Sequence, residues 1–501
     1  MRLSTRARYA VNALVELAAR KRDCTAAPVS LSEIAANQRL SLCYLEQLFG
    51  KLRRAGIVAS VRGPAGGYRL ARPASEVAIA DIVGAVDEEF CRAPPEEEAP
   101  AERCRAHAVW DELDRRIDRF LAGVTLADVA SGGQGRAPGP IYLDANATEP
   151  LRPAARAAML AALDGVGNPS SVHAAGRAAR NLLETAREKL AARFGGSPAD
   201  LVFTSGGTEA DALAVHALGA GRRLVVGATE HDAIRATAPG AAILPVDRDG
   251  VADLAALETM LAGGPALVCL MLANNETGTI QPVEEAGAIC RRYGAWLHVD
   301  AVQAAGRIGV DLAALGADAI ALSSHKLGGP AGAGALLLSG QAAAAMQPLI
   351  RGGGQERGRR GGTPPLPAIA GFAAAAEAEA EYDATGLAEL RDTAEAAATA
   401  CGAVVCGGGA RLANTTCLAL PGVRAETQVI ALDLAGFAVS AGAACSSGKV
   451  AESHVLTAMG LGALAGQAIR VSLPWNATKA DVDAFGRAYA AMAARLARRA
   501  A

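Results

Sequence analysis

Two motifs near the middle of the chain place an amine and a carboxylate on neighbouring elements. Lys326 ends the tetrapeptide 323–326, and Asp300 ends the apolar run 295–299, with Gln303 three residues later. Such a run is typical of a buried parallel strand, which would deliver the acid at its C-terminal edge. Pyridoxal phosphate needs this pair, because a lysine bonds to its aldehyde and an aspartate keeps its ring nitrogen protonated. The spacing therefore predicts a pyridoxal-phosphate site, with Gln303 beside it.

Other strand ends supply further polar groups to such a site. Gly207 and Thr208 lie between the apolar run 201–204 and an alanine-rich helix, where backbone N–H groups and a hydroxyl could cradle a phosphate. Arg470 could clamp the carboxylate of an amino acid, although a single arginine is also compatible with a surface ion pair. The remaining candidates are His231 to stack on the cofactor ring, Asn275 to reach the cofactor or a substrate carboxylate, and Ser323 and His325 to contact the cofactor.

Cys445 is the candidate nucleophile. It lies in the segment 440–448, which consists almost entirely of glycine, alanine and serine. Most cysteines are inert core residues. A cysteine without bulky neighbours instead indicates a reactive group on a loop that a rigid scaffold positions.

From about residue 141 to the end, the chain carries a series of motifs that resemble, in the same order, those of the NifS/IscS cysteine desulfurases. The resemblance implies a fold-type-I, pyridoxal-phosphate-dependent homodimer, in which Thr363 reaches the phosphate of the cofactor in the partner subunit. It also implies that the loop around Cys445 has the longer form, which suits handing sulfur to other proteins. The matching motifs are residues 143–148, 167–173, 208–209, 230–231, 274–278, 300–303, 324–326, 351–357 and the Cys445 loop.

The chemistry implied by this resemblance starts with L-cysteine taking the place of Lys326 on the cofactor. The freed Lys326 amine moves the α-proton, and Asp300 keeps the ring protonated while it stores electrons. The Cys445 thiolate then attacks the substrate sulfur, which leaves a persulfide on Cys445 and releases alanine. Cys445 is separately a candidate to hold a transient cluster. His231 is the candidate proton shuttle to the substrate thiol. An iron–sulfur scaffold or another acceptor protein would take the sulfur.

The first 72 residues have a different character. They carry thirteen Lys or Arg against four Asp or Glu, although the whole chain has a formal net charge of −2. Apolar spacing predicts a helix around 11–18, a short helix capped by Ser30 and Glu33, and a third helix capped by Ser41. Two strand-like runs follow, at 57–61 and 68–70, on either side of a glycine-rich turn. Three helices, a hairpin and excess positive charge predict a winged helix-turn-helix that binds nucleic acid.

Residues 1–130 resemble the IscR-like winged-helix transcription regulators in the ordered motifs 1–4, 8–11, 44–49, 60–64, 66–68 and 125–126. The resemblance implies that promoter DNA is the partner. Cys43 replaces the serine usual in that family, so the base preference could differ. The implied DNA-contacting residues are Ser41, Cys43, Glu46 and Gln47 in the major groove and Arg62 of the wing in a minor groove.

These regulators hold an iron–sulfur cluster through three cysteines and a histidine. Cys91, Cys104 and His107 match three of these ligands, but the middle cysteine is missing and an acidic, proline-rich patch at 94–100 stands in its place. We expect a two-iron, two-sulfur cluster with a carboxylate from 96–98 or another residue as fourth ligand. The alternative is a metal-free DNA-binding domain.

The whole chain has 501 residues, of which 51% are hydrophobic, and ten cysteines without the spacing of a disulfide framework. No stretch approaches the roughly 20 apolar residues of a membrane span, and no secretory leader is recognisable. We therefore expect a cytoplasmic protein with reduced thiols. The expected organisation is a winged-helix domain with a dimerisation helix (1–130), a glycine- and proline-rich linker (131–140) and an α/β domain of mostly parallel sheet (141–501) that ends in a smaller α+β domain.

Two other functions are compatible with the sequence. The chain could be a transcription regulator whose pyridoxal domain only senses amino acids, or a desulfurase whose amino-terminal domain binds no DNA. The candidate nucleophile Cys445 disfavours the first alternative, and Arg62 in the wing disfavours the second.

Overall fold

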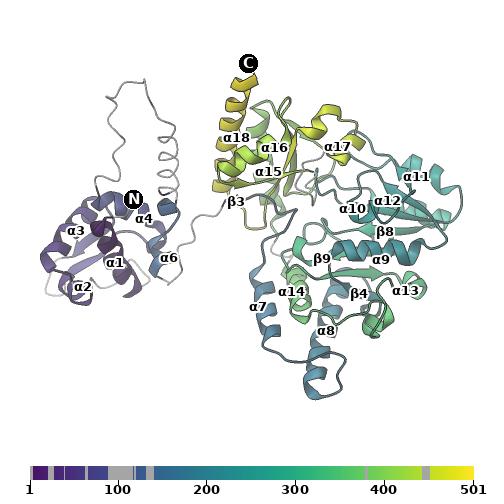
Figure 1. The fold of residues 1–501 in the computed structure, drawn as a ribbon, viewed down its shortest axis with the longest axis horizontal. Helices are drawn as coiled ribbons and strands as arrows, with labels where there is room; N and C mark the ends of the chain where they lie inside the picture. The colour runs from purple at the N-terminus through teal and green to yellow at the C-terminus, as the bar shows by residue number, and fades with distance from the viewer. Residues whose placement is uncertain are drawn as a thin grey trace. The chain divides into compact units, whose positions relative to one another are not determined.

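The computed structural model describes residues 4–20, 28–38, 40–61, 66–87, 117, 120–130, 140–378, 382–442 and 452–500. The chain forms two compact units, residues 1–139 and 140–501, and each is described by itself (Figure 1). In the described ranges, no helix is long and apolar enough to cross a membrane.

The first unit is a winged helix, as the sequence predicted. Ser30 and Ser41 each accept a backbone N–H three residues on, from Glu33 and Tyr44, at 3.3 and 3.2 Å. The wing strands pair antiparallel, with Val58 opposite Leu70. The elements are α1 (Thr5–Arg20), α2 (Leu31–Gln38), α3 (Leu42–Arg54), β1 (Val58–Val61), β2 (Gly67–Leu70), α4 (Ile79–Val86) and α6 (Leu126–Ala130).

An apolar core holds these helices together. The face of α3 at Leu45, Leu48, Phe49 and Leu52 is buried in it. Leu121 also belongs to this core, whereas Phe120 is exposed. The apolar stripe predicted for the dimerisation helix also includes Ile117, which packs against this core. Its other two residues, Val109 and Leu113, lie outside the described residues.

The second unit is built on a seven-stranded sheet of order β4-β10-β9-β8-β7-β5-β6. β10 runs antiparallel to both of its neighbours, and the other six strands run in one direction. The strands are β4 (Leu201–Thr204), β5 (Arg223–Gly227), β6 (Ala242–Leu244), β7 (Ala266–Met271), β8 (Trp296–Asp300), β9 (Ala319–Ser323) and β10 (Gly334–Leu338).

Helices cover both faces of this sheet, and two separate apolar cores lie between sheet and helices (Figure 1). One face packs against α9 (Gly207–Gly219), α10 (Asp232–Arg235) and α13 (Gly340–Ala345). The other packs against α7 (Pro153–Leu163), α8 (Ala174–Arg193), α11 (Leu254–Leu261), α12 (Val283–Tyr293) and α14 (Leu366–Glu377). This confirms the predicted layers.

A smaller α+β region completes the unit. Its antiparallel sheet has the order β11 (Val404–Cys406), β12 (Thr415–Ala419), β15 (Ala468–Ser472) and β14 (Ser440–Ala441). One apolar core joins it to α15 (Ala384–Thr399), α16 (Ala425–Leu434) and α18 (Lys479–Ala500), and another joins it to α17 (His454–Ala458). β3 (Ile141–Tyr142) pairs parallel with β13 (Phe437–Ala438), so the start of this unit is tied to the smaller region.

Candidate active site

The carboxyl ends of the strands that run in one direction meet at one edge of the large sheet. Asp300 is the last residue of β8, and Ser323 is the last residue of the adjacent β9. A short 3-10 helix, Ser324–Lys326, then carries Lys326. Gly207 begins α9 after β4. The residues that the sequence singled out on separate strands therefore share this edge.

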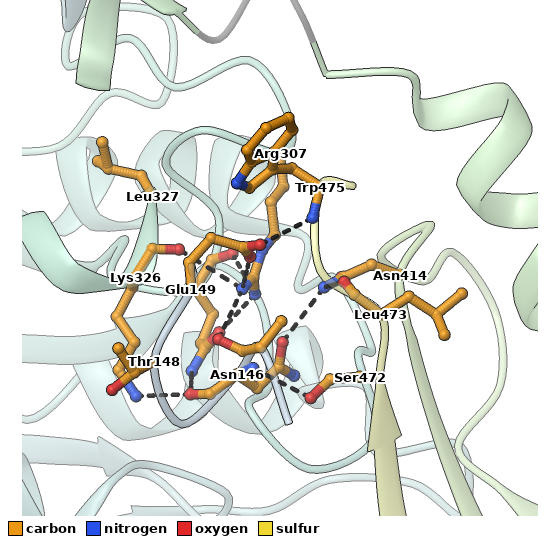
Figure 2. Close-up of polar contacts among 12 residues, drawn as sticks. Asn146, Thr148, Glu149, Arg307, Lys326, Leu327, Asn414, Ser472, Leu473 and Trp475 are labelled. Carbon is orange, nitrogen blue, oxygen red and sulfur yellow. Dashed lines mark hydrogen bonds and ion pairs between the residues drawn. The ribbon is translucent and has the colours of Figure 1, made fainter. Parts of the chain in front are cut away.

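Lys326 is a mostly buried amine that two backbone carbonyls hold. Its Nζ donates to Asn146 O at 2.5 Å and to Ala147 O at 3.1 Å (Figure 2). Burial, followed by the charges of Arg470 and Arg307, lowers the pKa of Lys326 to about 8. A substantial fraction of this amine is therefore neutral near pH 8, as a nucleophile requires.

Asn146 organises the space around this amine. Its carbonyl also accepts from Gln303 Nε2 at 3.0 Å, and its amide donates to Asn275 O and Thr415 Oγ1, each at 3.0 Å. One buried residue thus joins the lysine, the large sheet and β12 of the smaller region. Within the motif 143–148, no pattern of residues distinguishes Asn146 from its neighbours.

A buried ion pair between Arg307 and Glu149 supports this arrangement (Figure 2). Arg307 donates to Glu149 Oε2 at 3.2 Å and to Gln303 Oε1 at 2.6 Å. Glu149 also accepts the backbone N–H of Trp475 at 2.8 Å. Burial raises the pKa of Glu149. Neither residue was a candidate from the sequence, because their roles depend on contacts between segments more than 150 positions apart.

Asp300 lies in an acidic and buried part of the site. Burial, and next the charge of Asp211, raises the pKa of Asp300 to about 7. His298 is two residues earlier on β8 and so faces the same side of the sheet. Its Nε2 lies 3.0 Å from Asp211 Oδ1 on α9, and burial lowers the pKa of His298 to about 4.

The phosphate end of the predicted site has an unpaired buried hydroxyl. Ser323 Oγ is buried without a hydrogen-bond partner, at the edge where α9 presents its first backbone N–H groups. Thr208 is exposed in the first turn of that helix. His325 Nδ1 lies 3.1 Å from Thr148 Oγ1. A phosphate ester needs hydrogen-bond donors, which the unpaired hydroxyl and the helix N-terminus supply. The aldehyde of pyridoxal phosphate needs an amine, which Lys326 supplies, so these residues fit this cofactor.

A strained loop precedes Thr363, which is exposed. Glu356 and Arg357 have left-handed backbones, with φ of 48° and 58°, which is uncommon for residues other than glycine. Glu356 accepts both guanidinium Nη groups of Arg187 at 2.8 and 2.7 Å and the N–H of Phe203 at 2.9 Å. This buried clamp keeps the strained loop in place.

His231 and Arg470 are both engaged within the chain. The exposed His231 caps α10, and its Nδ1 accepts the N–H of Ala233 at 3.1 Å. Arg470 is buried, which excludes the surface ion pair that the sequence left open. Its Nη2 lies 2.6 Å from Asp144 Oδ1, its Nη1 donates to Asn275 O at 3.0 Å, and its Nε has no partner.

The remaining predicted residues divide into two groups. On α3 and its cap, Ser41, Cys43, Glu46 and Gln47 are all exposed, opposite the buried face of that helix. Five predicted residues lie outside the described residues, and their roles stay predictions: Arg62, Cys91, Cys104, His107 and Cys445.

Comparison with known proteins identifies the second unit. Residues 141–485 match the family described as aminotransferase class-V. A cysteine desulfurase of Cereibacter sphaeroides is 43% identical over 361 residues, which cover 68% of this chain and 93% of that protein. The chain belongs to the cysteine desulfurases. An IscS-like cysteine desulfurase of Mycobacterium tuberculosis is 39% identical over 369 residues, covering 68% of this chain and 93% of that protein.

Solved structures agree with this membership. A NifS-like protein from Rickettsia africae has a TM-score of 0.65 and 35% identity, and the match covers 70% of this chain and 99% of that one. Residues 3–132 match a second family, Rrf2, described as an iron-dependent transcriptional regulator. The chain is therefore a cysteine desulfurase fused to an IscR-like regulator domain, which confirms both resemblances.

Proposed function

We propose that this cysteine desulfurase converts L-cysteine to L-alanine at the edge of the large sheet and leaves the sulfur as a persulfide on Cys445. The observation that carries the proposal is the Lys326 amine, with its pKa lowered to about 8, held at the same sheet edge as Asp300. When bound, pyridoxal phosphate supplies an electron sink for the α-carbon of the substrate.

The side chains of the site have distinct tasks in this proposal. Lys326 holds the cofactor and moves the α-proton, and Asp300 faces the ring nitrogen. The backbone start of α9, Thr208 and Ser323 would hold the phosphate, and His325 and Gln303 would contact the cofactor. Arg470 orients the substrate carboxylate through its unpartnered Nε and an Nη, with Asn275 beside it. The exposed His231 would transfer a proton to the substrate thiol.

The chemistry is tested on the full chain by measuring sulfide and alanine from L-cysteine. Cys445→Ala should lose sulfide release and still bind cofactor and substrate, because the thiolate acts only after the substrate is bound. Lys326→Ala should lose the covalent attachment of the cofactor. Alanine release by Cys445→Ala at the parent rate, without added thiols, would exclude Cys445 as the nucleophile.

The proposal includes a homodimer. Large apolar side chains are exposed on and after α7, among them Leu160 at 47%, Leu163 at 62% and Val166 at 89%. Val172 and the pair Leu349 and Ile350 are exposed as well. Large apolar side chains with this exposure favour a partner surface. Thr363, exposed at the end of the strained loop, would then reach the phosphate in the partner subunit. Light scattering of the purified chain, and cofactor affinity of Thr363→Ala, test this.

The amino-terminal domain is proposed to bind promoter DNA through α3 and the wing. The exposed row of Ser41, Cys43, Glu46 and Gln47 supports this interpretation, because a recognition helix must leave one face free. Arg62→Ala should weaken binding of the full chain to promoters of iron–sulfur genes, and the affinity should fall steeply with salt. If the parent chain fails to bind these promoters even at low salt, the alternative in which this domain binds no DNA is favoured.

The same domain is proposed to hold a two-iron, two-sulfur cluster on Cys91, Cys104 and His107. The desulfurase is proposed to pass its sulfur to an iron–sulfur scaffold or another acceptor protein. Anaerobic reconstitution of the full chain tests the cluster. Stoichiometric iron and sulfide that Cys91→Ala loses would support it, whereas an iron-free product would leave a metal-free regulator domain.

A further inference from the structure

Two cysteines stand opposite each other in the smaller sheet. In the register of β11 and β12, Cys406 is the direct partner of Cys417. The same row continues across the sheet, because Cys417 is the partner of Arg470 on β15, and Arg470 is the partner of Ser440 on β14. Directly opposed residues of antiparallel strands point to the same face. The two thiols therefore lie side by side, one strand away from the proposed substrate-binding arginine.

The geometry of an antiparallel pair suits a disulfide. Directly opposed residues have Cα atoms roughly 4.5–5.5 Å apart, and disulfides join Cα atoms separated by about 4.4–6.8 Å. The Sγ of Cys406 donates to Val404 O at 3.9 Å. Each thiol also shifts the pKa of the other, so that the pKa of Cys406 is lowered and that of Cys417 is raised.

We propose that Cys406 and Cys417 form a reversible disulfide when the protein meets hydrogen peroxide. One thiol attacks the peroxide, the O–O bond breaks, and a sulfenic acid and water form. The second thiol then displaces the second water, so two thiols lose two hydrogens and two electrons, and one peroxide becomes two waters. A dithiol reductant reverses the reaction. The site is independent of the desulfurase chemistry proposed for Cys445.

The pair is buried, and the fold provides access through its edge. Cys406 is 2% exposed and Cys417 is 0% exposed, beneath Val455 and Leu456 of α17. β11 is a three-residue edge strand, and Val404 at its start is 42% exposed. Short edge strands open locally at low free-energy cost, which would admit a molecule as small as peroxide. Cys406 is the last residue of this strand and would be reached first.

The bond would close a loop that supports the active site. The segment 407–416 lies between the two cysteines. Ala410 accepts the N–H of Ile280, and Leu412 donates to Gly278 O, both at 2.8 Å. Thr415 accepts from Asn146, whose carbonyl holds Lys326. A disulfide would therefore tie the two ends of a loop that contacts the segment after Asn275 and the lysine site itself.

The test uses the full chain with its cofactor bound. The protein is treated with hydrogen peroxide, free thiols are alkylated under denaturing conditions, and peptides are mapped without reduction. We expect a pair of peptides joined through Cys406 and Cys417, two hydrogens lighter than the separate peptides, that dithiothreitol releases. Cys401→Ser is the matched control and should keep the linked pair, because Cys401 lies outside this row. Cys406→Ala should lose it.

The outcome on the parent protein decides the proposal even if a variant folds poorly. If exposed Cys43 is oxidised while Cys406 and Cys417 remain fully alkylated, the proposal is wrong. It is also wrong if Cys406 links instead to another cysteine. Loss of sulfide release on oxidation is not used as the readout, because oxidation of Cys445 would have the same effect.

Discussion

Replacing Arg470 by alanine tests whether this residue binds the substrate carboxylate. Its guanidinium is buried, with one Nη on Asp144 and the other on the Asn275 carbonyl. The Nε has no partner, so a carboxylate could gain a two-point contact there. Truncating one partner of a buried charge pair costs about 2–5 kcal/mol. Because Asp144 already neutralises part of the charge, we expect the lower part of this range, about 2–3 kcal/mol, or roughly 30- to 160-fold in kcat/KM.

The assay follows alanine release over a range of L-cysteine concentrations, with the visible absorption of the bound cofactor as a check on folding. Loss of a ground-state contact should appear mainly in KM. Asp144→Asn is the matched control: it keeps Arg470 and removes the competing carboxylate, so KM should be unchanged or lower. If Arg470→Ala keeps kcat/KM within about threefold of the parent while the cofactor stays bound, Arg470 has a structural role only.

Three further predictions concern other parts of the molecule. Because its pKa is lowered to about 8, the Lys326 amine is mostly neutral above that pH. The rate at which pyridoxal phosphate attaches to cofactor-free protein should therefore increase with pH and level off above about pH 8. A rate that still increases near pH 10, as expected for an ordinary lysine, would contradict the lowered pKa. Glu356→Ala leaves the buried Arg187 with Glu184 as its one carboxylate partner among the described residues, and should lower stability by up to about 3–5 kcal/mol, seen as a lower melting temperature. Glu184→Ala removes a half-exposed carboxylate and should cost less than about 1 kcal/mol; equal shifts would show that the buried clamp is no stronger than a surface pair. Gln47→Ala should reduce discrimination between promoter and random DNA by about 1–3 kcal/mol in a competition assay and leave desulfurase activity unchanged; an unchanged ratio would place the recognition surface elsewhere.

The sequence was sufficient to predict the large sheet and the residues at its edge. The apolar runs 201–204 and 295–299 predicted β4 and β8, and candidate site residues followed each run. Since parallel strands end at one edge, Asp300 and Lys326 could be placed together without coordinates. The winged helix could be predicted equally well, because Ser30 and Ser41 begin helices with a recognisable capping pattern.

The supporting contacts could not be predicted in the same way. His298 and Asp211 pair across 87 positions, Arg307 and Glu149 across 158, and Lys326 and Asn146 across 180. No local periodicity links such residues, since each pair forms only when separate elements pack. The register that places Cys406 opposite Cys417 is likewise a product of tertiary structure.

The charges of the site explain why these unpredicted residues matter. Near Lys326, the cations Arg307 and Arg470 lower its pKa, and the carboxylates Glu149 and Asp144 pair with them. On the opposite side, burial raises the pKa values of Asp211, Glu230 and Asp300, and their mutual repulsion adds to the shift for Glu230 and Asp300.

The groups around Lys326 therefore favour anions and a neutral amine, whereas no Lys or Arg among the described residues forms an ion pair with Asp300. A bound group with a phosphate at one end and a protonated ring nitrogen at the other would satisfy both requirements at once. The nitrogen would supply the positive charge that keeps Asp300 ionised, and the ionised Asp300 would keep the nitrogen protonated. The pairing of Asp211 with His298 would then limit how much negative charge competes for that proton. In the proposed function, residues outside the substrate contacts would thus help the ring to act as an electron sink.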